Sequence, residues 1–266
     1  MDLVVIFEPD ASFKVTKIEK KDTYYIVYGE FVEDRNPILE NVVEKYAKSS
    51  TENPVPPSGP KYTERFPASL SDILKPESDY KAKTLKDAIE NAGIEDIDDV
   101  IKKAFAKKKE RESILKDFNL TKEDVMSIFI YTLQNKGDGE KSVYRVLNNA
   151  LANRTKENLL PLREYIFYLL MGLRDLPRFI AKSNLFRGVR MSRKELDATY
   201  CKGRTLVWTT FTSTTTDEKA ARKFASDVKN KEEKHDPDEC SVLFEIYGKF
   251  RGYSIGTFSR YRKEEG

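Results

Sequence analysis

The chain has 266 residues, of which 39% are hydrophobic and 34% are charged, and its 47 Lys and Arg exceed its 44 Asp and Glu by three. This length predicts one large domain or two smaller ones, and 15 Phe with 14 Tyr supply enough large side chains for a core, which excludes global disorder. A net charge of +3 over this length gives no field that favours nucleic acid as the partner.

Residues 1–48 have the composition of a small β-rich N-terminal module. The runs 3–7, 13–18 and 23–28 are rich in β-branched and aromatic residues, and polar turns bound each of them. The simplest arrangement is a small antiparallel meander. Apolar residues at helical spacing over 38–46 then predict a short helix that covers one face of it.

A Pro-rich linker and a helical connector follow. The segment 49–79 holds six of the chain's 11 prolines, which remove backbone donors and favour extended chain. Two apolar stripes within 80–118 predict two helices, the first ended by Gly93. The charges of 107–112 are of mixed sign, which favours a solvated helix face over a phosphate-binding patch.

The third part, 119–266, predicts helices first and strands afterwards. Thr121 with Asp124 is a near match to a capping box at a helix start. The apolar periodicity predicts helices at 125–133, 143–151 and 161–173, strands at 185–189, 206–213 and 241–246, and a short helix at 218–227. This order indicates an α+β fold rather than a βαβ succession.

Histidine, cysteine and membrane chemistry are not favoured. The single histidine, His235, lies in a charged segment that predicts a loop, which argues against catalytic triads and His-based zinc sites. Cys201 and Cys240 cannot form a disulfide scaffold and lack zinc spacing, so no metal is expected. No apolar run approaches about 20 residues, and 3–7 is too short for a secretory signal, so we expect a cytoplasmic protein with no membrane partner.

Arg187 stands within an apolar strand and is followed by Gly188. A charge in that setting needs a partner, and the planar guanidinium matches a phosphate with two parallel hydrogen bonds. The glycine would let backbone groups reach a flat carboxamide. The alternative is an edge-strand arginine paired with a surface carboxylate.

A hydroxyl-rich run, 211–217, precedes the short predicted helix. Thr216 or Asp217 suits the N-cap of that helix, and threonines suit a strand. This explanation does not account for Ser213, so the hydroxyls are also candidates for the lining of a cleft.

Together these elements resemble the Arg-Ser-Glu class of mono-ADP-ribosyltransferases. That class has an aromatic-Arg-Gly strand, a Phe-x-Ser-Thr-Ser strand with a helix behind it, and a later strand pair ending in Glu-x-Glu followed by Val-Leu. Here 185–189 reads Leu-Phe-Arg-Gly-Val and 211–215 reads Phe-Thr-Ser-Thr-Thr, with threonine for the final serine. Residues 242–248 and 253–259 resemble the stretch before the family's catalytic turn. The resemblance covers roughly 121–266 and implies helices followed by a mainly antiparallel split β-sheet.

The sequence departs from this pattern at its C-terminal end, which reads Lys263-Glu264-Glu265-Gly266. Counted from Ser259, either Glu264 is the first glutamate and Gly266 takes the catalytic place, or Glu265 is first and its partner lies beyond Gly266. A third count, with a shortened loop, makes Glu264 or Glu265 catalytic, and Glu265 is the candidate. Such an end is expected of a fragment of a longer product or of a chain trimmed to silence toxicity.

The resemblance implies a role for each matched residue. NAD would be the co-substrate, with Arg187 on its phosphates and the Gly188 backbone on its nicotinamide amide. Ser213 would orient the catalytic glutamate and the ribose, Thr214 would shape the pocket, and Glu265 would stabilise the oxocarbenium-like ribose. A glutamate at the first position implies arginine as the acceptor side chain of the protein substrate.

Two other functions stay open at this point. The first is an inactive ADP-ribosyltransferase-like module that binds NAD or another protein, which the missing catalytic carboxylate favours. The second is a basic nucleic-acid-binding module, motivated by the cluster 107–111 and the tyrosines, which would show a steep salt dependence.

Overall fold

The computed structural model describes residues 4–7, 9, 11–32, 84–92, 121–133, 142–153, 155–174, 176, 178–179, 183–226, 238–249 and 252–256. The chain divides into two compact units. One consists of Met1–Arg35 with Pro177–Thr257, and the other of Asn36–Leu176 with Phe258–Gly266. The predicted linker 49–79 and the second connector helix lie outside the described residues.

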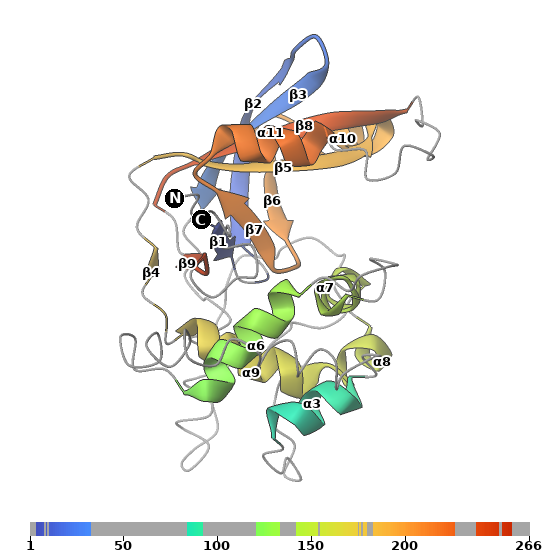
Figure 1. The fold of residues 1–266 in the computed structure, drawn as a ribbon. Helices are drawn as coiled ribbons and strands as arrows, with labels where there is room; N and C mark the ends of the chain where they lie inside the picture. The colour runs from blue at the N-terminus through green and yellow to red at the C-terminus, as the bar shows by residue number, and fades with distance from the viewer. Residues whose placement is uncertain are drawn as a thin grey trace, which may run out of the picture. The chain divides into compact units, whose positions relative to one another are not determined.

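The second unit is helical where it is described. Its helices are α3 (Leu85–Asn91), α6 (Lys122–Thr132), α7 (Val143–Asn153), α8 (Lys156–Leu159) and α9 (Arg163–Arg174). Figure 1 shows α6 beside α9. Tyr165 donates its hydroxyl to the Ser127 carbonyl at 2.9 Å, which ties α9 to α6. Gly172 permits the close approach, because a Cβ there would be 2.8 Å from the Asp124 carbonyl oxygen.

The first connector helix and the helices predicted at 125–133, 143–151 and 161–173 are confirmed. Thr121 and Asp124 form a complete capping box at the start of α6, each side chain accepting from the other's backbone N–H. The stripe predicted at 161–173 starts with a short turn, and its helix begins at Arg163. No described helix is both long enough and apolar enough to pass through a bilayer.

The first unit is built on one mixed, mostly antiparallel sheet. Its strands are β1 (Val4–Phe7), β2 (Ala11–Lys20), β3 (Tyr24–Val32), β4 (Arg178–Phe179), β5 (Leu185–Ser192), β6 (Thr205–Trp208), β7 (Thr212–Thr215), β8 (Glu239–Tyr247) and β9 (Gly252–Ser254). Their order is β4-β9-β1-β7-β5-β8-β3-β2-β6, and β3 with β8 is the parallel pair. The α+β class is therefore confirmed.

The predicted N-terminal meander is wrong for its first strand. β2 and β3 do form an antiparallel hairpin, but β1 pairs with β7 and β9 instead of β2. β1 is apolar throughout, and Val5, Ile6 and Phe7 are at most 1% exposed. A strand buried on both faces belongs inside a sheet. The first 32 residues therefore build the same sheet as the C-terminal strands, not a sheet of their own.

The strand predicted at 206–213 is corrected to two strands. β6 ends at Trp208 and pairs with β2 at one edge of the sheet, whereas β7 begins at Thr212 and pairs with β1. Between them the Thr212 hydroxyl donates to the Thr210 carbonyl at 3.1 Å, a local bond that competes with strand pairing. The chain thereby crosses from the edge to the middle of the sheet.

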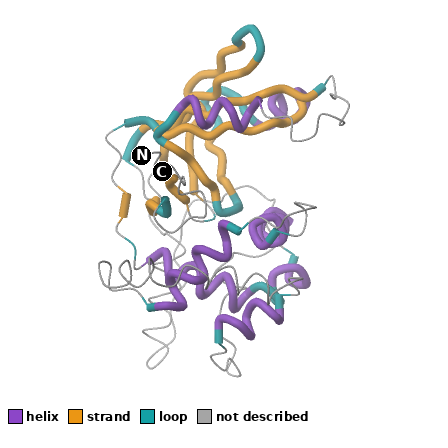
Figure 2. Tube along the Cα trace, viewed as in Figure 1, coloured by secondary structure: helices purple, strands orange, loops and turns teal. Residues whose placement is uncertain are grey.

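Two helices are described in this unit, α10 (Arg193–Thr199) and α11 (Glu218–Ser226). The prediction of α11 is confirmed, and Figures 1 and 2 show it lying along β5 and β8. The sequence analysis missed α10, although Ser192 caps it by accepting from the Glu195 backbone N–H at 3.0 Å. Leu196 of α10 packs into an aromatic-rich core with Phe7, Phe13 and Phe244.

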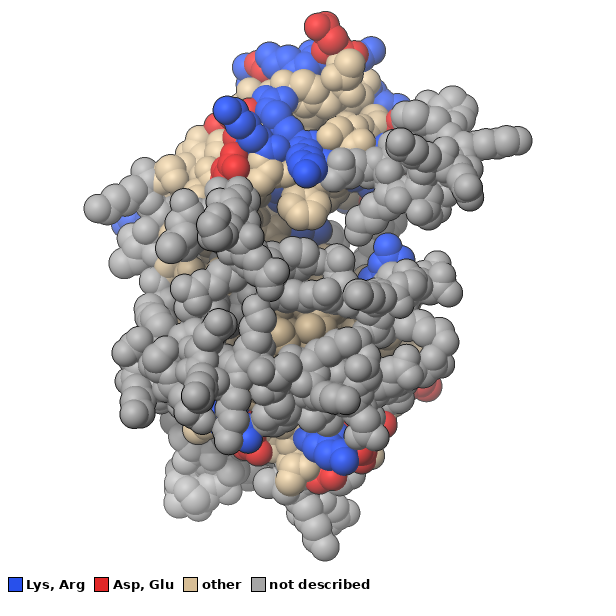
Figure 3. All heavy atoms as spheres, in the orientation of Figure 1, with Lys and Arg blue, Asp and Glu red and all other residues tan. Residues whose placement is uncertain are grey.

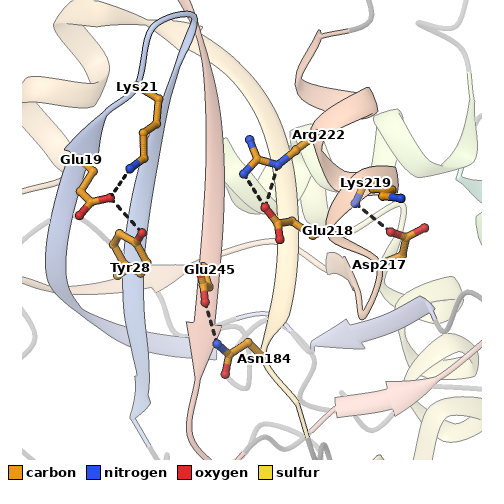
Figure 4. Close-up of polar contacts among 9 residues, drawn as sticks. All are labelled: Glu19, Lys21, Tyr28, Asn184, Asp217, Glu218, Lys219, Arg222 and Glu245. Carbon is orange, nitrogen blue, oxygen red and sulfur yellow. Dashed lines mark hydrogen bonds and ion pairs between the residues drawn. The ribbon is translucent and has the colours of Figure 1, made fainter.

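Several basic side chains in this unit have acidic partners. Glu19 on β2 pairs with Lys17 and Lys21, and it accepts from the Tyr28 hydroxyl (Figure 4). Figure 3 shows Lys and Arg beside Asp and Glu on the upper part of the face drawn. That mixture differs from the single-sign surface that favours nucleic acid.

We expect the Glu19 cluster to make stability depend on pH. Hydrogen bonds from Lys17, Lys21 and Tyr28 lower the pKa of Glu19 from 4.5 to about 2. Because the folded pKa lies below the unfolded one, the stabilisation is complete above about pH 4.5 and disappears as the pH falls through about 2. The effect is small, since the pairs are exposed. Melting temperatures of wild type and Glu19→Gln should differ at pH 7 and converge near pH 2, and a constant difference would contradict this.

Candidate functional site

Arg187 and Ser213, predicted from separate strands, meet through the Ser213 backbone, because the strand registers place the Ser213 side chain on the sheet face opposite to Thr214 and Arg187. The Arg187 Nη1 atom donates to the Ser213 carbonyl oxygen at 2.9 Å. β5 and β7 are in register at the pair Phe186 and Thr215 and at no further pair. The Arg187 side chain therefore bridges the two strands where their pairing stops.

The Arg187 guanidinium enters an aromatic environment. Side chains alternate along a strand, so Arg187 leaves β5 on the same face as Leu185, a member of the core. Its Cζ atom lies 5.9 Å from the centroid of the Trp208 ring. Trp208 packs in turn on Phe13 and Phe244, with ring centroids 4.5 and 5.6 Å away. The charge is thus half-buried against an aromatic wall.

Within the described part of the chain, no carboxylate pairs with Arg187, and the hydrogen bond to Ser213 is the only one that its side chain makes. Two other arginines of this unit differ. Arg190, on the same strand, reaches Glu239 at 2.8 and 3.0 Å, and Arg222 on α11 pairs with Glu218. The alternative of a surface ion pair therefore describes Arg190 but not Arg187. A half-buried guanidinium with unused donors is suited to bind an anion.

Gly188 faces the opposite side of β5, against α11. A Cβ at this position would lie 1.7 Å from the Ala221 carbonyl oxygen and 2.9 Å from the Ala225 backbone nitrogen. Glycine is needed here because helix and strand backbones touch. The structure thus supplies a packing reason for Gly188 that the sequence analysis, which considered only the approach of a ligand, did not find.

The hydroxyls of Ser213 and Thr214 on β7 have different surroundings. Thr214 is 3% exposed, and its hydroxyl donates to the Val5 carbonyl oxygen of β1 at 3.1 Å. Ser213 is half-buried, and its hydroxyl makes no hydrogen bond to any described residue. The Thr214 hydroxyl is therefore engaged in the sheet, whereas the Ser213 hydroxyl is available.

The end of the hydroxyl-rich run caps α11. Asp217 accepts from the Lys219 backbone N–H at 2.8 Å, and its carbonyl accepts from the Ala221 N–H at 3.1 Å (Figure 4). Thr215 accepts from the Asp217 N–H at 3.1 Å. The N-cap interpretation is confirmed for Asp217.

Sequence reasoning missed the aromatic neighbours of Arg187. Burial raises the pKa of Tyr200, while a hydrogen bond with Trp208 and the charge of Arg187 act in the opposite direction. Trp208 lies three residues before Phe211. The one feature of the sequence that could have drawn attention to it is that it is the chain's single tryptophan.

A second polar pair lies at the β5–β8 boundary. Asn184 donates to Glu245 at 2.7 Å (Figure 4), and this carboxylate is half-buried on β8, opposite Phe186. The candidate catalytic residue Glu265 and its neighbour Glu264 lie outside the described residues.

The chain matches the model of a known protein family. A family model described as NAD:arginine ADP-ribosyltransferase matches residues 64–265, so the chain belongs to that family and the predicted resemblance is confirmed. The match begins well before Thr121, where the sequence resemblance started. Searches of curated proteins and of solved structures gave no significant match.

Proposed function

We propose that the protein transfers ADP-ribose from NAD to an arginine side chain of an acceptor protein. Family membership supports NAD and arginine as the substrates. The observation that carries the proposal for this chain is Arg187, a half-buried guanidinium tied to the Ser213 strand without a carboxylate partner among the described residues. A pyrophosphate would supply the missing negative charge.

The proposed reaction breaks the bond between the ribose C1′ atom and nicotinamide, and the bonding electrons leave with nicotinamide. A nitrogen of the acceptor guanidine then bonds to C1′ and loses a proton. The developing charge on the ribose resembles that of glycoside hydrolysis, so a carboxylate beside it stabilises the transition state. We assign that role to Glu265.

The other residues would bind and orient NAD. Arg187 holds phosphate oxygens with its unused N–H donors, and the Gly188 backbone contacts the nicotinamide amide. We assign the Ser213 hydroxyl to the ribose and the carboxylate because the family's motif gives that serine this role. We assign Thr214 an indirect role, because its hydroxyl already binds Val5.

The direct test supplies NAD labelled in its adenylate part together with two acceptor peptides. One peptide carries arginine as its only basic residue and the other carries lysine. The proposal predicts label on the arginine peptide, with one nicotinamide released per label. Label on the lysine peptide alone would refute the acceptor assignment. NAD binding by calorimetry with neither label nor nicotinamide would identify the inactive NAD-binding module instead.

Ser213→Ala and Thr214→Val should have opposite consequences. Ser213→Ala removes a hydroxyl without a described partner, so the melting temperature stays unchanged while turnover falls, on the order of 10-fold or more. Thr214→Val removes the buried hydrogen bond to the Val5 carbonyl, which costs about 1 kcal/mol of stability. Thermal denaturation and initial rates of both variants check this. Equal losses of stability would remove the distinction between the two hydroxyls.

A further inference from the structure

The N-terminal strand β1 lies inside the sheet, although its residues are outside the segment that the family model matches. The match spans 64–265, and β7 and β9 lie within it, whereas β1 consists of residues 4–7. In the sheet, however, β1 lies between β9 and β7 and is antiparallel to both (Figure 1). Two strands of the matched region are therefore joined by a strand from outside it.

The contacts of β1 are those of an interior strand. Val5 is completely buried, and Gly252 of β9 packs directly on it, because a Cβ at Gly252 would lie 2.6 Å from the Val5 Cγ1 atom. On the same face of β1, Phe7 stacks on Phe31 with ring centroids 5.4 Å apart. Phe7 also lies 6.4 Å from Trp208, the ring that faces Arg187.

β1 also sets the position of Ser213. Ile6 is the direct partner of Ser213 in the β1–β7 register, and the Val5 carbonyl accepts the buried Thr214 hydroxyl. β7 pairs with β5 at a single position, so most of its strand pairing comes from β1. The Ser213 carbonyl that receives Arg187 is therefore held mainly by the N-terminal strand.

β1 and β9 are neighbours in the sheet although they are far apart in the sequence. Val5 is opposite Ser254, so the last residue of β9 lies beside the start of β1. Antiparallel neighbours are commonly consecutive in sequence and joined by a short turn. Here they come from the two distant ends of the printed sequence.

We propose that β1 is a donor strand and a positioning element. The N-terminal segment completes the ADP-ribosyltransferase sheet by strand addition and thereby holds Ser213 against Arg187. The part of this inference that concerns NAD rests on the proposed function. The part that concerns the sheet does not.

A double-mutant cycle tests the contact between β9 and β1. Gly252→Ala should push β1 out of register, lowering the melting temperature and raising the Kd for NAD about 10-fold. Val5→Ala removes the Cγ1 atom that the new methyl group meets, so the double variant should recover much of both losses. Val27→Ala is the matched control, because Val27 is equally buried but lies on β3, and it should give no recovery. A Gly252→Ala protein that melts like wild type, or equal recovery with Val27→Ala, would overturn the proposal.

A nicked chain gives the second measurement. A protease site inserted after Pro9, between β1 and β2, allows β1 alone to be cut from the strands that follow it without being removed. The proposal predicts that both pieces elute together and that NAD binding persists, with the Kd within about twofold of the uncut protein. Separation of the pieces with an unchanged Kd would overturn it. If the uncut protein binds no NAD, the proposed function fails, while co-elution and the melting-temperature cycle still decide the place of β1.

Discussion

Arg187→Ala should weaken NAD binding about 10- to 100-fold while the fold is retained. The variant removes a charged donor set, and a hydrogen bond to a charged group contributes about 1.5–3 kcal/mol. The side chain forms no ion pair among the described residues, so its loss breaks only the hydrogen bond to the Ser213 carbonyl and the contact with Trp208. Calorimetric titration with NAD and the value of kcat/KM measure the effect.

Arg190→Ala is the matched control for this prediction. It removes the same charge from the same strand, but its side chain is already paired with Glu239. NAD affinity should therefore stay within about twofold of wild type, since a partly exposed ion pair contributes little. Arg187→Lys should restore only part of the affinity, because lysine lacks the planar fork. Equal losses for Arg187→Ala and Arg190→Ala would point to a general effect of charge and would contradict a phosphate site at Arg187.

Gly188→Ala should be strongly destabilising. The new Cβ would overlap the Ala221 carbonyl oxygen, at 1.7 Å, and it would approach two more backbone atoms of α11 within 3 Å. The backbone atoms of α11 cannot relieve the overlap by changing rotamer, as a side chain could, so the whole helix must move away from β5. Overpacking of this kind costs about 3 kcal/mol or more, which lowers the melting temperature by roughly 10 °C in a protein of this size. Thermal denaturation followed by circular dichroism measures it.

Gly29→Ala is the control for that substitution. Its Cβ would also meet an atom at short distance, 2.6 Å, but that atom belongs to the Phe13 ring, which can shift. Both variants lose the same freedom in the unfolded chain, so their difference isolates the contact. The Gly29→Ala loss should be about 1 kcal/mol. A Gly188→Ala protein as stable as Gly29→Ala would show that α11 does not pack on β5 as described.

Local signals in the sequence predicted much of this architecture. Thr121 and Asp124 predicted the start of α6, because a capping box depends only on two residues three positions apart. The structure contains this capping box. The proximity of Arg187 and Ser213 followed from the family resemblance, which carries information about distant pairs that periodicity does not contain.

The position of β1 in the sheet could not be predicted from local sequence patterns. Val4, Val5 and Ile6 have the composition of a buried strand, but this composition does not indicate which strands they pair with. The predicted meander assumed that neighbours in sequence are neighbours in the sheet. The partner of Val5 is instead Ser254, and only the folded structure brings the two together. The packing reason for Gly188 was hidden likewise, since it depends on α11.

The aromatic wall beside Arg187 gives the protein an intrinsic optical reporter. Trp208 is the chain's single tryptophan, and its ring lies 5.9 Å from the guanidinium carbon. Its fluorescence therefore originates at one defined place, next to the group assigned to the phosphates. Emission during a titration would follow occupancy of that place without any attached dye, and it would separate ligands that reach Arg187 from those that bind elsewhere on the surface.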